Sequence, residues 1–142
     1  MENSVIIKFQ AWDGEKMYDV KNICFEGRPM ITLQYNPACR KPLDNVKLLQ
    51  YIGFKDKNNK EVFADYIIKY FIETGGISER VKGFAYGVVK YKVSKYVIEP
   101  FKYDESLSSV FGKDKIFGFL DSESFADVEI IGNIHEDKHL LE

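Results

Sequence analysis

The feature that most constrains this chain is a period-two alternation of apolar and polar residues, which recurs along the sequence. Residues 7–11, 31–35 and 89–93 each place an apolar side chain at every second position. Successive side chains of a strand point to opposite faces of a sheet, whereas a helix repeats about every 3.6 residues. The alternation therefore predicts half-buried β-strands, and signals for helices are few.

Turn-forming residues separate these segments at short intervals. Asp13-Gly14 follows the first alternating segment and predicts a tight hairpin, because both residues tolerate a positive φ. Residues 17–25 would be the return strand. Residues 27–29 (Gly-Arg-Pro) and 56–60 (Asp-Lys-Asn-Asn-Lys) predict two further turns from their composition.

The other expected elements follow from composition and length. Residues 62–72 are interpreted as one strand because of their β-branched and aromatic content, with a helix as the alternative that their length allows. Pro37 and Pro42 are expected to bound a loop around Cys39, and Pro100 to end the strand that contains residues 89–93. The remaining expectations are strands at 48–55, 116–120 and 126–134, helical turns at 104–111 and 137–141, and a break at Gly75-Gly76.

Seven or eight short strands predict a mainly β fold, a small antiparallel barrel- or sandwich-like domain with one or two short helices. A chain of 142 residues, 15% of them aromatic, is long and apolar enough to bury a core. We expect residues 1–142 to form a single domain. Residues 1–45 either pack into that domain or form a separate N-terminal hairpin subregion, and the sequence leaves both alternatives open.

Charge is unevenly distributed, although the net charge is only −2. Residues 82–102 carry five lysines and one glutamate, a net charge of +4, and residues 103–142 carry a net charge of −7. The small total gives no overall attraction to nucleic acid or to an anionic membrane. No apolar run approaches the ~20 residues that span a bilayer, and the N-terminus does not resemble a signal peptide. We expect a cytoplasmic protein without membrane contact, whose two cysteines, Cys24 and Cys39, are free thiols.

Three segments of the chain carry a recognisable pattern. They are Ile-Lys-Phe-Gln-Ala-Trp-Asp at residues 7–13, Leu-Gln-Tyr-Ile-Gly-Phe-Lys-Asp-Lys-Asn-Asn-Lys-Glu-Val-Phe at residues 49–63, and Val-Glu-Ile-Ile-Gly-Asn-Ile at residues 128–134. Together they resemble the YopX family of phage and prophage proteins, from residue 7 to the end of the chain. The resemblance implies a mainly β protein of a phage or prophage in a bacterial host, and it implies no reaction.

The chain departs from the family's pattern in two places. Asn59 stands in a turn where the family usually has glycine, and Asn tolerates the left-handed conformation that such a turn needs. Residues 64–67 read Ala-Asp-Tyr-Ile where the family often has Glu-Gly-Asp-Ile, so a site built on that Gly-Asp would be absent here. The three segments also have a structural explanation, as a hairpin, a solvated turn and a strand in which Gly132 marks either a bulge or a close backbone approach.

Two arrangements of residues look catalytic but lack the context that catalysis needs. Residues 135–139 spell His-Glu-Asp-Lys-His, the H-E-x-x-H spacing of zinc proteases, yet no third ligand follows and we expect a frayed tail. Adventitious zinc or nickel binding by His135 and His139 is the alternative to that tail, and it would carry no function. A nucleophilic pair of Cys24 or Cys39 with one of the two histidines would lack an orienting third group. The sequence therefore predicts no catalytic residue, no metal site and no cofactor.

One group of residues points to binding. Lys90, Lys92 and Lys95 lie among Tyr91 and Tyr96, and lysines interleaved with aromatic rings can bind single-stranded nucleic acid through phosphates and stacked bases. Alternation, however, puts Tyr91 on the face opposite Lys90 and Lys92, and lysines also guard exposed strands against edge pairing. The candidate residues for contact with nucleic acid or another partner are Lys90, Lys92, Lys95 and Tyr96.

We expect a non-enzymatic accessory protein of a phage or prophage, which acts through protein contacts or self-association as a homo-oligomer. Its aromatic content exceeds what a core of this size needs, which favours a phage or host protein as partner. The alternative is a nucleic-acid-binding accessory or regulatory factor that uses the basic strand at residues 82–102.

Overall fold

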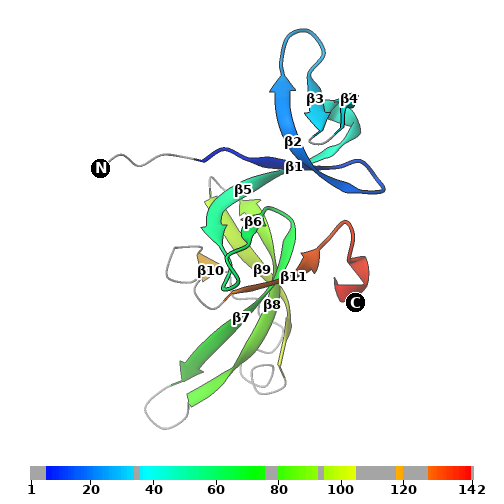
Figure 1. The fold of residues 1–142 in the computed structure, drawn as a ribbon. Coiled ribbons are helices and arrows are strands. Elements are labelled where there is room, and N and C mark those ends of the chain that lie inside the picture. The colour runs from blue at the N-terminus through cyan, green and yellow to red at the C-terminus, as the bar shows by residue number, and fades with distance from the viewer. Residues whose placement is uncertain are drawn as a thin grey trace, which may run out of the picture. The chain divides into compact units, whose positions relative to one another are not determined.

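The computed structural model describes residues 6–33, 36–75, 80–92, 95–104, 118–119 and 128–141. This part of the chain consists mainly of strands, with two short 3-10 turns, η1 (Leu43–Asn45) and η3 (Lys138–Leu141) (Figure 1). No helix among these residues is long and apolar enough to cross a membrane. The strands are β1 (Phe9–Trp12), β2 (Met17–Cys24), β3 (Met30–Leu33), β4 (Asn36–Pro42), β5 (Lys47–Lys55), β6 (Glu61–Phe63), β7 (Tyr66–Gly75), β8 (Arg80–Lys92), β9 (Lys95–Tyr103), β10 (Gly118–Phe119) and β11 (Glu129–Asn133).

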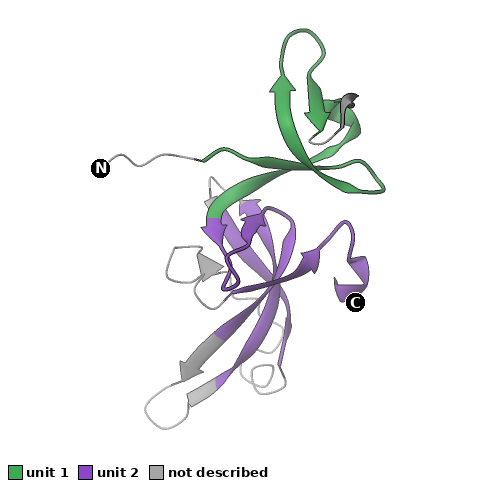
Figure 2. Cartoon of the chain, in the orientation of Figure 1, with its two compact units in different colours: residues 1–53 green, residues 54–142 purple. Residues whose placement is uncertain are grey.

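The strands form two antiparallel sheets. One has the order β4-β3-β2-β1-β5-β6 and the other the order β10-β9-β8-β7-β11, and neither closes into a barrel among the described residues. The predicted mainly β, antiparallel fold is confirmed in its sandwich-like form. The chain divides into two compact units, Met1–Gly53 and Phe54–Glu142 (Figure 2). The expectation of a single domain stays a prediction.

In the first unit, the Asp13-Gly14 hairpin between β1 and β2 is confirmed. Oδ1 of Asp13 accepts the backbone N–H groups of Glu15 and Lys16, each at 2.8 Å, and Gly14 has a φ of 103°. The amides of Lys16 and Glu15 hold the pKa of Asp13 below its ordinary value. The carboxylate of Asp13 thus accepts hydrogen bonds from backbone N–H groups that have no strand partner in the tight turn.

The core of this unit is formed by alternating residues of β1 and β3, as the period-two pattern predicts. Ala11, Ile31 and Leu33 are fully buried there. The half-buried apolar side chains packed against them are Tyr18, Val20, Ile23, Leu43 and Val46. Cys24, at the end of β2, carries a free thiol and is half-buried rather than part of the core.

The expected loop between Pro37 and Pro42 is wrong, because these residues form β4. This strand pairs with β3, with Arg40 opposite Thr32 and Pro42 opposite Met30. It lies at the edge of its sheet, where a proline has no second neighbour that needs its missing N–H. Cys39 lies within β4, and its side chain is outside the described part of the structure.

In the second unit, the prediction of a single strand at residues 62–72 is wrong, because the segment forms two strands. The segment is divided into β6 and β7 by a turn at Ala64-Asp65, where Asp65 has a φ of 70°. A left-handed residue reverses the chain and lets β6 and β7 join different sheets. No Gly or Pro marks this turn, so composition did not reveal it.

The prediction of one strand that ends at Pro100 is also wrong. The segment forms two antiparallel strands, β8 and β9, in which Lys92 pairs with Lys95. Pro100 is buried within β9 opposite Gly87, next to a register shift. A Cβ at Gly87 would lie 2.5 Å from Cγ2 of Ile98, so the glycine allows the two strands to approach at the bulge.

The remaining strands complete the second sheet. β10 falls within the segment expected at 116–120 and pairs with β9, and β11 pairs with β7 with a register shift between Ile130 and Gly132. The predicted bulge near Gly132 is therefore confirmed. The buried side chains of this unit include Ile67, Ile68, Val62, Ala85, Val89, Ile98 and Val128. The helical turn expected at 104–111 lies, beyond Asp104, outside the described residues, and the one expected at 137–141 is the 3-10 turn η3.

Candidate functional site

The four residues predicted from the sequence gather on the β8–β9 hairpin. Lys92 pairs with Lys95, and Tyr91 pairs with Tyr96 so that their ring centroids lie 5.0 Å apart in an edge-to-face arrangement. Burial, followed by the neighbouring Tyr91, raises the pKa of Tyr96. Lys90 pairs with Val97 instead, one position along from the tyrosines, and therefore lies on the opposite face of the hairpin. The pairing of β8 with β9 therefore places Lys90 on the face opposite the two rings, as the alternation predicted.

Lys90 forms an ion pair within the protein. Its Nζ lies 3.2 Å from Oδ1 of Asp65, with the two side chains 35% and 25% exposed. The carboxylate of Asp65 thus compensates the positive charge of Lys90, the residue for which the sequence suggested a contact with phosphate. Lys90 is therefore a weaker candidate for binding an external anion than its place in the basic segment implied.

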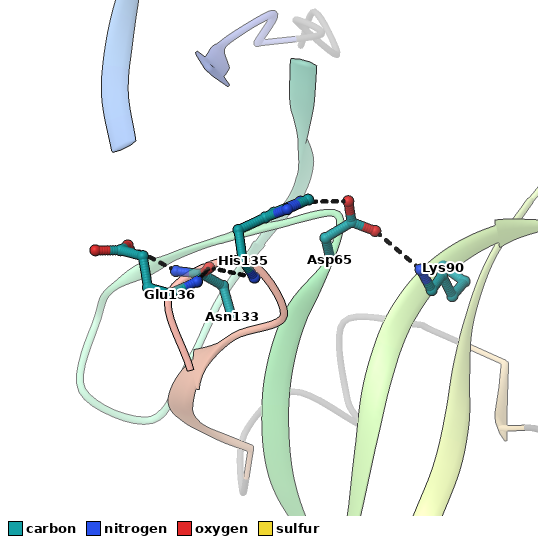
Figure 3. Close-up of polar contacts among 5 residues, drawn as sticks. All are labelled: Asp65, Lys90, Asn133, His135 and Glu136. Carbon is teal, nitrogen blue, oxygen red and sulfur yellow. Dashed lines mark hydrogen bonds and ion pairs between the residues drawn. The ribbon is translucent and has the colours of Figure 1, made fainter. Parts of the chain in front are cut away.

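Asp65 is the centre of a polar cluster that also contains His135 (Figure 3). Its second carboxylate oxygen, Oδ2, lies 3.1 Å from Nε2 of His135, whose side chain is 13% exposed. The backbone of Asp65 is bonded as well: its N–H donates to the carbonyl oxygen of Val89 at 2.8 Å, and its carbonyl oxygen accepts the N–H of Ile134 at 3.0 Å. Asp65 thus joins the β6–β7 turn, β8 and the segment after β11.

Asn133 organises the chain on the histidine side of this cluster. Its Oδ1 accepts the backbone N–H groups of His135 at 3.0 Å and Glu136 at 2.9 Å, and its Nδ2 donates to Oε1 of Glu136 at 2.9 Å (Figure 3). Oδ2 of Asp137 accepts the N–H of Asn133 at 3.1 Å. The expectation of a frayed tail is therefore wrong for these residues, which form a turn fixed by side-chain hydrogen bonds.

This arrangement does not support the zinc-protease reading of His135 and His139. The two histidines belong to different local structures, a turn and η3, so they do not share a helical face as H-E-x-x-H chemistry requires. Within the described ranges, no group of three or more His, Cys, Asp or Glu side chains is placed to hold a metal ion. The contacts of Asp65 with Lys90 and His135 hold three segments of the chain together, and we interpret them as structural.

The left-handed φ of Asp65 also explains a departure from the family pattern. Glycine stands at the equivalent of position 65 in the pattern Glu-Gly-Asp-Ile, and a glycine adopts such a φ without strain. Aspartate is among the few other residues that tolerate this conformation. Asn59 follows the same rule in the preceding turn, with a φ of 64°, so its predicted left-handed conformation is confirmed.

A second carboxylate, that of Asp56, fastens the turn at residues 56–60 to β11. Its Oδ1 accepts the N–H groups of Asn58 and Lys60, each at 2.9 Å, and its Oδ2 accepts the N–H of Ile130 at 3.0 Å. Burial raises the pKa of Asp56, but the amides of Ile130, Lys60 and Asn58 together outweigh it and hold the pKa below its ordinary value. The second and third patterned segments of the sequence therefore meet at this buried side chain.

The sheet of the second unit carries an exposed surface that sequence reasoning missed. Phe71 pairs with Phe84 across β7 and β8, and their ring centroids lie 5.8 Å apart. The two residues are 42% and 39% exposed. The Nζ of Lys69 lies 4.2 Å from the centroid of the Phe84 ring. Exposed rings and a cation thus share one side of the sheet.

The same surface continues onto β9. Tyr86 pairs with Lys69 on one side and with Lys102 on the other, and the Nζ of Lys102 lies 5.7 Å from the centroid of the Tyr86 ring. We call the surface formed by Lys69, Phe71, Phe84, Tyr86 and Lys102 the aromatic–lysine face. The sequence holds one signal for it, the alternation at residues 69–71 and 84–86, but the register that unites the strands is not local information.

Contact of a lysine with a ring at an exposed site is weak. Such cation–π contacts contribute about 0.5–1 kcal/mol, whereas stacking of a base on an aromatic side chain contributes about 1–3 kcal/mol. The ammonium of Lys69 can therefore be displaced from the ring of Phe84 by a stronger ligand. In the free protein the contact covers part of an exposed ring and holds a positive charge beside it.

Comparisons with known proteins fit the fold and leave the activity open. The crystal structure of protein EF1440 from Enterococcus faecalis is similar, with a TM-score of 0.54 and 21% sequence identity, over 98% of this chain and 100% of that chain. At this identity the likeness concerns the fold. No curated protein matches the chain. A family model described as "YopX protein" matches residues 8–142, and the chain therefore belongs to the YopX family.

Proposed function

We propose that this chain is a non-catalytic binding protein whose working surface is the aromatic–lysine face, and that its partner is an anionic macromolecule. The observation that carries the proposal is the pair of exposed rings of Phe71 and Phe84 with the ammonium of Lys69 beside them. Large apolar side chains that gather on a surface mark interaction sites more often than single exposed ones do. Aromatic residues also contribute most to the binding energy of interfaces.

The charges beside the rings favour an anionic partner. Lys69 and Lys102 project their ammonium groups over the rings. Glu129 pairs with Lys69 across β11 and β7, and its Oε2 is engaged by Nζ of Lys57 at 3.1 Å. Asp104 lies beside Phe84, and its Oδ2 accepts the N–H of Phe84 at 2.7 Å. That carboxylate is directed at the backbone, while the two ammonium groups lie over the exposed side of the sheet.

Self-association through this face is disfavoured by the same charges. Two copies stacked face to face would bring Lys69 and Lys102 of one copy toward those of the other, and juxtaposed like charges oppose association. A homo-oligomer, which the sequence suggested, would therefore use another surface. That oligomer stays a prediction, and light scattering over a range of protein concentrations tests it.

The proposal is tested by matched charge variants. Lys69→Gln/Lys102→Gln removes two charges from the aromatic–lysine face, and Lys92→Gln/Lys95→Gln removes two from the hairpin end, so both variants have the same net charge. Binding of two fluorescent anionic probes, a single-stranded oligonucleotide and polyglutamate, is measured for each at low salt. We expect at least one probe to bind, and the first variant to weaken that binding more than the second. Failure of both probes to bind, or equal weakening by the two variants, would refute the proposal.

The biological setting is proposed on the resemblance described above. We propose an accessory role in a phage or prophage, in the cytoplasm of a bacterial host. Localisation of a tagged full-length protein in cells that carry the intact gene neighbourhood tests this setting. A protein found mainly in the membrane or exported fraction would contradict it.

A further inference from the structure

We infer that the anionic partner of the aromatic–lysine face is single-stranded nucleic acid. This inference rests on the proposed function and names the partner class of the same surface. It transfers the nucleic-acid hypothesis from the predicted hairpin residues, Lys90, Lys92, Lys95 and Tyr96, to a different part of the sheet.

The geometry of three neighbouring strands is the first support. Side chains opposite each other across antiparallel strands lie about 5 Å apart, and those two positions apart along a strand about 7 Å. Lys69, Tyr86 and Lys102 form one such row across β7, β8 and β9, and Phe71 and Phe84 form part of the next. The first row continues on β11 with Glu129, whose carboxylate forms an ion pair with Lys57. A base stacked on a ring would therefore keep its own phosphate within reach of a lysine in the neighbouring row.

The distribution of chemistry on the surface is the second support. On the hairpin, Lys90 lies on the other face from the paired rings of Tyr91 and Tyr96, and it forms an ion pair with Asp65. On the aromatic–lysine face, two lysines and three rings share one side of the sheet. Binding of single strands without sequence preference combines these two features, a basic track for the backbone and rings for the bases.

The choice between nucleic acid and an acidic protein follows from the rings and the lysines. An acidic segment would use the ammonium groups but would gain little from flat aromatic surfaces, whereas every base has a π-face that can stack. Lysine acts as a point charge, which suits a phosphate, and lacks the planar fork by which arginine holds a carboxylate. Single strands are favoured over a duplex because only an unpaired base can lie on a ring.

Fluorescence anisotropy with full-length protein tests the inference. The probes are labelled single strands of DNA and RNA of about 20 nucleotides, the matching duplex, and polyglutamate. Raising salt from about 50 to 200 mM should weaken single-strand binding about tenfold if two to three phosphates are neutralised. Phe71→Ala/Phe84→Ala should weaken it by at least about fivefold, and Tyr91→Ala, which removes an exposed ring from the hairpin, should change it by less than about twofold.

The folding of each variant is checked by circular dichroism. If the alanine pair fails to fold, Phe71→Leu/Phe84→Leu keeps apolar bulk, removes the π-faces and should weaken single-strand binding in the same direction. Binding of polyglutamate but not of single strands would overturn the inference and leave the proposed function standing. Equal affinity for single strand and duplex, or loss of binding with Tyr91→Ala but not with the phenylalanine variants, would also overturn it. Binding of no probe would overturn both.

Discussion

Replacing Asp65 by alanine is expected to destabilise the second unit more than replacing it by asparagine or by glycine. The reason is that two separate features meet at this residue. Its carboxylate contacts Lys90 and His135, and its backbone has a left-handed φ of 70°. Asparagine tolerates that φ but has no charge, glycine tolerates it but has no side chain, and alanine offers neither advantage.

The magnitudes follow from the contacts. The half-exposed pair with Lys90 contributes about 0.5–1 kcal/mol, and the more buried contact with His135 about 1.5–2 kcal/mol, the lower part of the range for charge-assisted hydrogen bonds. Alanine loses both and adds about 1 kcal/mol of backbone strain, so Asp65→Ala should cost about 3–4 kcal/mol. Asp65→Gly should cost about 2–3 kcal/mol, and Asp65→Asn, which keeps a neutral acceptor, about 1–2 kcal/mol.

Urea unfolding at pH 7, followed by circular dichroism, measures these differences. Glu129→Gln is the matched control, because it breaks an exposed ion pair with Lys57 in the same unit and should leave the midpoint nearly unchanged. A double-mutant cycle of Asp65→Asn with His135→Gln should show coupling of at least about 0.5 kcal/mol. The reasoning is refuted if alanine costs no more than asparagine, or if the cycle shows no coupling.

Three further predictions concern single positions. The pKa of Asp56 is lowered in the folded protein, so its carboxylate stabilises the fold above the unfolded pKa of about 3.9, and this stabilisation is lost as pH falls through the folded pKa. The difference in unfolding free energy between wild type and Asp56→Asn should therefore shrink when urea unfolding is repeated at acid pH. A difference that stays constant with pH would contradict this role of Asp56. Gly87→Ala should cost about 1–3 kcal/mol in thermal unfolding, because its Cβ would lie 2.5 Å from Cγ2 of Ile98; a cost near zero would mean that the bulge relaxes. Asn59→Ala should lower the unfolding free energy by about 1 kcal/mol and Asn59→Gly should not, since φ is 64° there; equal effects would contradict the role of φ.

The sequence predicted the parts of the fold that local chemistry determines. The Asp13-Gly14 hairpin and the turn at residues 56–60 both follow from residues that tolerate a positive φ or that accept backbone hydrogen bonds. Prediction failed where tertiary pairing overruled composition. Ala64-Asp65 turns without glycine or proline, and the prolines of β4 are tolerated because that strand lies at an edge.

The candidate surface could be predicted only in part, for a related reason. Alternation correctly separates Lys90 from Tyr91, since it depends on neighbours in the chain. The aromatic–lysine face instead depends on which residues of β7, β8 and β9 lie opposite one another, and the shift at Gly87 changes that register. Alternation within each strand does not determine the register between strands, and here the bulge beside Gly87 shifts that register.

The family's patterned segments are explained by contacts within the protein. The first forms the β1–β2 hairpin through Asp13, and the second and third meet where Asp56 accepts the N–H of Ile130. At Gly132, a Cβ would lie 2.5 Å from Oδ2 of Asp137, so a glycine leaves room for the side chain that fixes the last turn. The residues proposed to bind a partner lie outside these segments, on the middle strands of the second sheet.

The most direct test of the proposed binding surface is an NMR titration of ¹⁵N-labelled protein with a single-stranded oligonucleotide. We expect the largest amide shift changes at residues 69–71, 84–86 and 102, with those of the hairpin at 91–96 and of the first unit changing little. Shifts concentrated on the hairpin would return the site to Lys90, Lys92, Lys95 and Tyr96. Shifts confined to the first unit, or no shifts at an oligonucleotide excess, would contradict a binding role for the aromatic–lysine face.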